Sequence, residues 1–262
     1  MTIQDKFAAL RRSGEKALVC FFTAGDQPLE DLPEIVSLLA EAGADIIEIG
    51  IPFSDPFGEG PTIQDSSQRA LENGASLSKI LDAISQCKVD IPLVTMGYYN
   101  PVLRFGLAEY AKRSKEAGCT GTIVSDLVPD EAHDWDSACE SAGLETIYLV
   151  APTSTQERIH QVTSQSTGFV YVVSRTGVTG AESAVPMEIS GLVRKVKDLT
   201  EKPVCVGFGI STPAHVKLVC QEADGAVVGS AVVSMFHKHW SNPSERPLIS
   251  EFVRSLKSAT AP

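Results

Sequence analysis

One acidic residue lies inside an otherwise apolar run of the sequence. Glu48 has an isoleucine on either side, within the stretch of residues 45–52. A carboxyl group among apolar neighbours loses the hydration that stabilises its charged form, so we expect its pKa to rise. A carboxyl group that stays protonated near neutral pH can act as a general acid. The structural alternative is an ion pair between Glu48 and an arginine or lysine inside the protein.

A second acidic segment follows at residues 54–61. It holds Asp55 and Glu59 together with two glycines and two prolines. Such a loop can bring Asp55 or Glu59 over the mouth of an active site, where a second carboxylate would assist the chemistry. A solvated acidic turn is the alternative interpretation.

Two glycine-rich turns come late in the chain, at residues 207–211 and at Gly229-Ser230. Each follows an apolar run, and the second opens a helical pattern. Free backbone N–H groups at the start of a helix bind phosphate, and loops in these positions form a recurrent phosphate site in α/β barrels. Simple tight turns are the alternative. A third glycine-containing segment, residues 175–180, has the composition of a loop that closes over a ligand, or of a plain flexible loop.

The composition limits the kinds of partner. The net charge of −11 disfavours nucleic acids and anionic membrane surfaces, so a ligand phosphate has to be held by local backbone dipoles. The six cysteines are scattered without a C-x-x-C pair, and the five histidines fall on helical patterns, so we expect no metal site. With no signal-peptide core and no 18-residue apolar run, we expect a soluble cytoplasmic protein.

Eight short apolar runs alternate with helical patterns along the chain. Their near-continuous hydrophobicity is typical of parallel strands buried on both faces. The predicted strands are residues 17–23, 45–52, 92–98, 121–126, 146–151, 169–174, 203–207 and 225–229. The clearest helical patterns between them are residues 34–42, 107–117, 131–142, 187–199 and 213–221, and Gly43, Gly118 and Gly143 stand where helices should end.

This alternation predicts an α/β fold, a (β/α)8 TIM barrel that forms a single domain over residues 1–262. A doubly wound open sheet is the competing architecture, although no G-x-G-x-x-G follows the first strand. We expect an extra N-terminal helix, whose Phe7 and Leu10 cover the barrel floor, and extra helices near strand eight, including one over residues 247–258. The active site of such a barrel lies at the carboxyl ends of the strands.

The ordered motifs resemble the tryptophan synthase alpha chain family over nearly the whole chain, from residues 21–26 to 229–231. The stretches that carry the resemblance are residues 43–56, 60–64, 98–101, 174–180 and 207–211. The resemblance implies a retro-aldol lyase of tryptophan biosynthesis, which splits indole-3-glycerol phosphate into indole and glyceraldehyde 3-phosphate. It also implies that this chain has no cofactor of its own.

Roles for individual residues follow from the same resemblance. Glu48 matches the general acid–base glutamate, and Tyr171 matches a tyrosine close to it. The remaining matches concern the substrate: the walls around the indole ring are Phe21, Ile63, Tyr98, Ile123 and Phe208, the closing loop contains Thr179 and Gly180, and the phosphate cradle is Gly209, Gly229 and Ser230.

The chain departs from the family pattern at the second catalytic acid. The family's loop usually reads Ser-Asp-Pro-Leu-Ala-Asp-Gly-Pro, whereas this chain has Phe57, Gly58 and Glu59 in place of leucine, alanine and aspartate. One added methylene can displace a carboxylate by more than an ångström, and misplacement on that scale costs about a hundredfold in rate. Gly58 gives the backbone freedom to compensate, so we expect Glu59 to take part in the chemistry.

The resemblance also implies a protein partner. In the family, a beta chain that carries pyridoxal phosphate condenses indole with serine, and the two chains form an α2β2 heterotetramer. Asp55 and Pro56 match the loop that meets the beta chain. Three other functions stay open: a weakened alpha chain that mainly activates the beta chain, a lyase that works without a beta chain, and a barrel enzyme for another phosphosugar.

Overall fold

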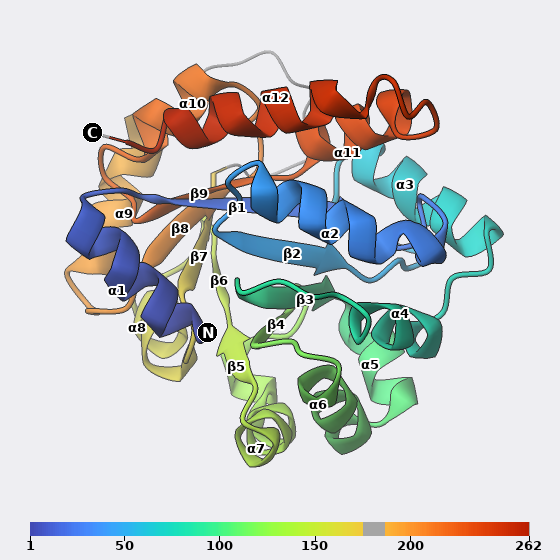
Figure 1. The fold of residues 1–262 in the computed structure, drawn as a ribbon. Coiled ribbons are helices and arrows are strands. Elements are labelled where there is room, and N and C mark those ends of the chain that lie inside the picture. The colour runs from blue at the N-terminus through green and yellow to red at the C-terminus, as the bar shows by residue number, and fades with distance from the viewer. Residues whose placement is uncertain (175–186, 262) are drawn as a thin grey trace.

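Parallel strands form the centre of the molecule, as Figure 1 shows for the computed structural model, which describes residues 1–174 and 187–261. The strands follow one another in the order β5-β4-β3-β2-β1-β9-β8-β7-β6, and every pair is parallel. The arrangement is a TIM barrel, as predicted. The strands are β1 Ala17–Thr23, β2 Ile46–Gly50, β3 Leu93–Gly97, β4 Gly121–Val124, β5 Glu145–Ile147, β6 Leu149–Val150, β7 Val170–Val173, β8 Val204–Gly207 and β9 Gly225–Val228.

The fifth predicted strand is interrupted, so one run of sequence contributes two strands. Between β5 and β6, the N–H of Tyr148 donates to Ser166 Oγ (3.2 Å) and its carbonyl accepts from the N–H of Tyr171 (3.1 Å). The Tyr148 hydroxyl donates to Asp136 outside the strands (2.6 Å). The chain therefore leaves the ladder with β4 and joins the ladder with β7 at this residue, which brings the two ends of the sheet together.

Helices surround the strands on the outside (Figure 1). The helical patterns identified in the sequence are confirmed, with ends that shift by at most two residues. Gly43, Gly118 and Gly143 follow helices with positive φ, as their predicted role requires. The helices are α1 Ile3–Ser13, η1 Leu29–Asp31, α2 Leu32–Glu41, α3 Pro61–Glu72, α4 Leu77–Ile84, α5 Tyr99–Phe105, α6 Leu107–Glu116, η2 Pro129–Glu131, α7 His133–Ala142, α8 Gln156–Gln165, α9 Met187–Lys197, α10 Pro213–Val219, α11 Ser230–His239 and α12 Arg246–Ser258. Within the described ranges, no helix combines the length and the apolar composition needed to cross a lipid bilayer.

Helix α1 closes the amino-terminal end of the barrel. Ile3, Phe7 and Leu10 are buried against the inward-facing residues of the strands, and the ring of Phe7 meets that of Phe169 edge-on at 6.2 Å. Gln4 Nε2 donates to the carbonyl of Gly168 (3.0 Å). The predicted floor is thus confirmed, and it leaves the opposite end of the barrel for a ligand.

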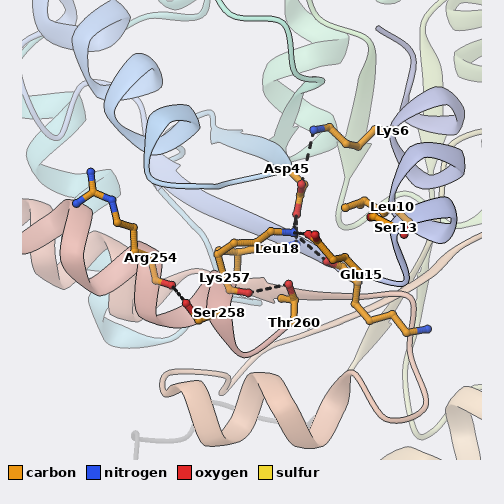
Figure 2. A network of polar contacts seen from close by, with 11 residues as sticks. Lys6, Leu10, Ser13, Glu15, Leu18, Asp45, Arg254, Lys257, Ser258 and Thr260 are labelled. Carbon is orange, nitrogen blue, oxygen red and sulfur yellow. Dashed lines mark hydrogen bonds and ion pairs between the residues drawn. The ribbon is translucent and has the colours of Figure 1, made fainter. Parts of the chain in front are cut away.

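A partly buried ionic network ties this closed end together (Figure 2). Asp45 Oδ2 accepts from the N–H of Leu18 in β1 (2.9 Å) and from Lys257 Nζ in α12 (2.8 Å). Lys257 also pairs with Glu15 (2.8 Å), and Lys6 of α1 lies 3.6 Å from Asp45 Oδ1. One carboxylate therefore joins the first helix, the first two strands and the last helix.

We expect Asp45→Asn to lower the free energy of unfolding by about 2 kcal/mol, because it leaves the half-buried Lys257 ammonium with one carboxylate instead of two. Urea denaturation followed by far-UV circular dichroism measures this. The matched control is Asp82→Asn, which breaks the pair with Arg113, where the Asp82 side chain is 68% exposed. That loss should stay within about 0.5 kcal/mol, and equal losses in both variants would contradict the assignment.

Candidate active site

A cavity of about 420 Å³ opens at the carboxyl ends of the strands, opposite α1. Its volume falls in the range of about 300–1,000 Å³ that small-molecule sites occupy. It is lined by β1, β2, β3, β7 and β9 and by the segments that follow β2, β8 and β9. The lining residues are Phe21, Glu48, Glu59, Gly60, Pro61, Thr62, Ile63, Met96, Tyr171, Phe208, Gly209, Ile210, Ser211, Val227, Gly229, Ser230, Ala231 and Ser234.

Glu48 points into this cavity from the middle of β2. Side chains alternate along a strand, so Ile47 and Ile49 face the helices while Glu48 shares the barrel interior with Ile46. The residue is 1% exposed, and among the described residues Glu48 Oε2 has no hydrogen-bond partner and no cation within ion-pair distance. Burial, with a smaller contribution from the charge of Glu59, raises the pKa of Glu48 to about 8.

Glu59 brings a second carboxyl group to the same cavity. It is half-buried near the end of the loop between β2 and α3, and burial raises its pKa to about 7. Its N–H donates to the carbonyl of Pro56 (3.0 Å), and its carbonyl accepts from Gln64 Nε2 (2.8 Å). The other acid of this loop, Asp55, is solvent-exposed and does not line the cavity. The loop therefore leaves Asp55 in solvent and places Glu59 in the cavity.

Tyr171 lies beside Glu48, fully inside the barrel. Its pKa is raised well above the ordinary value by burial first, and then by the charges of Glu48 and Glu59. The hydroxyl occupies the space next to Gly207, where a Cβ atom would lie 2.2 Å from it. Position 207 is thus restricted to glycine as long as the tyrosine keeps this place.

Apolar side chains form the walls of the cavity. The ring of Phe21 lies close to Gly50 and Gly229; a Cβ at Gly50 would come within 2.5 Å of it. The ring of Phe208 meets that of Tyr171 edge-on at 6.0 Å. Phe208 has a backbone φ of +69°, a value that residues other than glycine rarely adopt. Its carbonyl accepts a hydrogen bond from Ser174 Oγ. Backbone strain at position 208 therefore accompanies the placement of one aromatic wall.

Backbone N–H groups gather at the far side of the cavity. Helix α11 begins at Ser230, and its first intrahelical bond runs from the Val233 N–H to the Gly229 carbonyl (3.0 Å). The preceding N–H groups of the helix have no partner inside it and can bind an anion. Ser230 and Ser234 stand one turn apart on the cavity side, and Gly209 has a φ of +82° in the facing loop. None of the described lining residues is a lysine or arginine.

The structure brings together most of the site residues predicted from the sequence, but two lie beside the cavity. Ile123 is fully buried in the barrel interior, and Tyr98 is 5% exposed next to the loop that carries Glu59. Thr179 and Gly180 lie outside the described residues. Three lining residues lie outside the segments that the sequence analysis assigned to the site: Met96, Val227 and Ser234. The four-residue spacing of Ser234 from Ser230 is the one signal that points to such a residue.

Comparisons with known proteins show the family of this chain. The sequence model of a family described as tryptophan synthase alpha chain matches residues 7–260. The tryptophan synthase alpha chain of Geobacter sulfurreducens is 46% identical over 259 residues, with 98% of each chain covered. That of Geobacter sp. strain M21 is 48% identical over 239 residues, with 90% of each chain covered.

Solved structures with this fold match over the same length. A structure of Mycobacterium tuberculosis tryptophan synthase superposes with a TM-score of 0.90 at 35% identity, covering 99% of this chain and 98% of the other. Tryptophan synthase subunit alpha from Legionella pneumophila gives a TM-score of 0.90 at 31% identity, with 99% and 98% covered. Because sequence and fold agree from end to end, this chain belongs to the tryptophan synthase alpha chain family.

Proposed function

We propose that this chain is the lyase that cleaves indole-3-glycerol phosphate into indole and glyceraldehyde 3-phosphate. The observation that carries the proposal is a buried carboxyl group, Glu48, which faces a helix amino terminus across one apolar cavity. An aromatic ring suits the apolar walls, and a phosphate suits the helix amino terminus. Family membership supports the same reaction and favours it over a chain that mainly activates a partner.

Glu48 moves the proton that the reaction needs. Its protonated carboxyl group donates to C3 of the indole ring, which leaves the ring with a positively charged, iminium-like nitrogen. The bond between C3 and the glycerol carbon then breaks, and its electron pair restores the aromatic ring. The Glu48 carboxylate takes the proton of the adjacent hydroxyl group, whose carbon becomes the aldehyde of glyceraldehyde 3-phosphate. Glu48 is protonated again at the end, so no other reactant is required.

Glu59 stabilises the charge that develops on the ring. Its carboxylate accepts the indole N–H and lies near the nitrogen that becomes positive when C3 is protonated. The ionised Glu59 also disfavours ionisation of Glu48, as the raised pKa of Glu48 reflects. The working state of the pair is therefore a neutral Glu48 and a charged Glu59. Tyr171, packed beside Glu48, keeps water away from the proton that is transferred.

Substrate binding divides between the two sides of the cavity. We assign the indole ring to the apolar slot of Phe21, Ile63 and Phe208, and the phosphate to the N–H groups at Gly209, Gly229 and Ser230. Ser211 and Ser234, which also line the cavity, extend this cradle with hydroxyl donors. A helix dipole favours a nearby anion by about 0.3–2 kcal/mol, so the phosphate can be held without a basic side chain.

We also propose a beta chain as the partner, in an α2β2 assembly in the cytoplasm, with pyridoxal phosphate held by the beta chain and none by this one. Asp55 is exposed and Pro56 is half-buried on the outer part of the loop that carries Glu59. Phe57 beside them is 71% exposed. Docking of a partner on this loop would cover an apolar ring and act directly on the position of Glu59.

Replacing Glu48 tests the central role. Glu48→Gln keeps the shape of the side chain but cannot deliver the proton, so we expect indole release to fall by a factor of at least about 1,000. The thermal midpoint should stay equal or rise, because the variant no longer buries an ionisable group. The control, Glu41→Gln on the exposed side of α2, should keep full activity. A Glu48→Gln enzyme with native turnover would end this assignment.

Shortening Glu59 tests whether this loop is built for a glutamate. We expect Glu59→Asp to cleave no faster than the native chain, because the native carboxyl group already reaches the cavity. Steady-state kcat/KM for indole release, measured with and without a beta chain, gives the answer. If the aspartate variant were about tenfold faster, the native carboxylate would be misplaced and the activator function would regain support.

The two carboxyl groups predict a bell-shaped pH dependence of kcat/KM. Below about pH 7 Glu59 becomes protonated and loses its charge, and above about pH 8 Glu48 ionises and loses the proton that C3 needs. These midpoints belong to the coupled pair. The profile should be recorded with intrinsic fluorescence at each pH, to separate titration from unfolding. A flat profile in folded protein would contradict the proposed roles.

A further inference from the structure

Tyr98 lies beside the cavity and holds the loop that carries Glu59. It follows β3 directly, as the residue before α5, and its side chain reaches across to the loop between β2 and α3. The hydroxyl accepts a hydrogen bond from the N–H of Gly58 (3.1 Å). A side chain on the barrel wall therefore fixes the backbone one residue before Glu59.

Two aromatic rings of the same loop pack on Tyr98. The ring of Phe53 lies 5.2 Å away in a tilted arrangement, and that of Phe57 lies 5.4 Å away edge-on. Phe57 is otherwise largely exposed, so its contact with Tyr98 is what places it on the barrel. The loop is thus bound to one tyrosine by a polar contact and by two apolar contacts.

The other contacts of Glu59 are local. Its N–H reaches Pro56 and its carbonyl reaches Gln64, both within the same stretch of chain. These two contacts join the loop to itself and to α3, whereas the contact between Gly58 and Tyr98 joins it to the end of β3. Burial, followed by the charge of Glu59, raises the pKa of Tyr98 to about 12, so its hydroxyl stays neutral where it accepts from Gly58.

We infer that Tyr98 is a positioning residue for Glu59, because its hydroxyl holds Gly58 and thereby sets how deeply the longer glutamate side chain enters the cavity. Gly58 takes part in the same contact: a Cβ at this position would lie 3.2 Å from the Tyr98 hydroxyl. Gly58 and Glu59 then act together. Without a Cβ at position 58 the loop packs closely on Tyr98, and the additional methylene of Glu59 lets its carboxyl group still reach the cavity. The inference rests on the proposed function only for its effect on turnover.

The test follows the titration of Glu59 itself. Tyr98→Phe keeps the ring and removes the acceptor, so we expect the carboxyl group to move toward water and its midpoint to fall by about one unit from about 7. NMR of protein labelled with ¹³C at the glutamate carboxyl groups measures this, and Glu59→Gln assigns the signal. Gly58→Ala, which disturbs the same contact from the backbone side, should shift the midpoint in the same direction.

The control is Tyr148→Phe, which also removes a buried tyrosine hydroxyl but on the outside of the barrel, where it donates to Asp136. It should lower the thermal midpoint without moving the Glu59 titration. An unchanged Glu59 midpoint in folded Tyr98→Phe would overturn the inference.

Turnover provides the second measurement. We expect Tyr98→Phe to lower kcat/KM about tenfold in the native background and to have no further effect in Glu59→Gln, because both changes act on one carboxylate. An equal loss in both backgrounds would overturn the inference, since Tyr98 would then act on the substrate by another route. If the native chain itself released no indole, the proposed function would fail, while the NMR titration would still decide the role of Tyr98.

Discussion

A carboxyl group that is buried with no counter-ion among the described residues is the constraint on which the site depends. Glu48 lies inside a barrel whose other interior residues near it are apolar, such as Ile46 and Val94. A nearby lysine or arginine would hold the carboxylate in its charged form, and the group would then have no proton to give at neutral pH. The folded chain therefore retains a proton that the unfolded chain releases. This difference in protonation lowers the free energy of unfolding at neutral pH, and the extensive apolar packing of the barrel offsets it.

Charge is distributed unequally between the two ends of the barrel. At the closed end, Asp45 pairs with lysines, and Asp224 repeats the pattern by accepting from the N–H of Val204 (3.0 Å) and from Lys197 (3.1 Å). At the open end, Glu48 and Glu59 line a cavity whose described residues include no cation. Cations thus stabilise the amino-terminal ends of the strands, whereas the described residues that line the cavity offer no cation to lower the raised pKa of Glu48. The general division of α/β barrels into a stabilising and a catalytic end has this electrostatic form here.

The sequence predicted what depends on local composition. Apolar runs located the strands because each is buried on both faces, and the isoleucines around Glu48 identified a desolvated carboxyl group. The break in the fifth strand could not be predicted, since it depends on the Ser166 hydroxyl, which is distant in sequence and replaces a strand partner at Tyr148. Tyr98 was predicted to line the cavity but lies beside it, because its position depends on how the loop that carries Glu59 packs against the barrel. Ser234 could not be assigned from the sequence, because this face of α11 meets the cavity only after folding.

The interruption at Tyr148 gives the barrel a natural point of division. Every strand ladder of the described sheet lies either within residues 1–147, within residues 149–261, or between β1 and β9, and none joins β5 to β6. A chain cut beside Tyr148 would therefore lose no strand pairing. The two pieces would be arcs of five and four strands that recombine along the β1–β9 ladder, with Glu48 and Glu59 on the first arc and Gly209, Gly229 and Ser230 on the second.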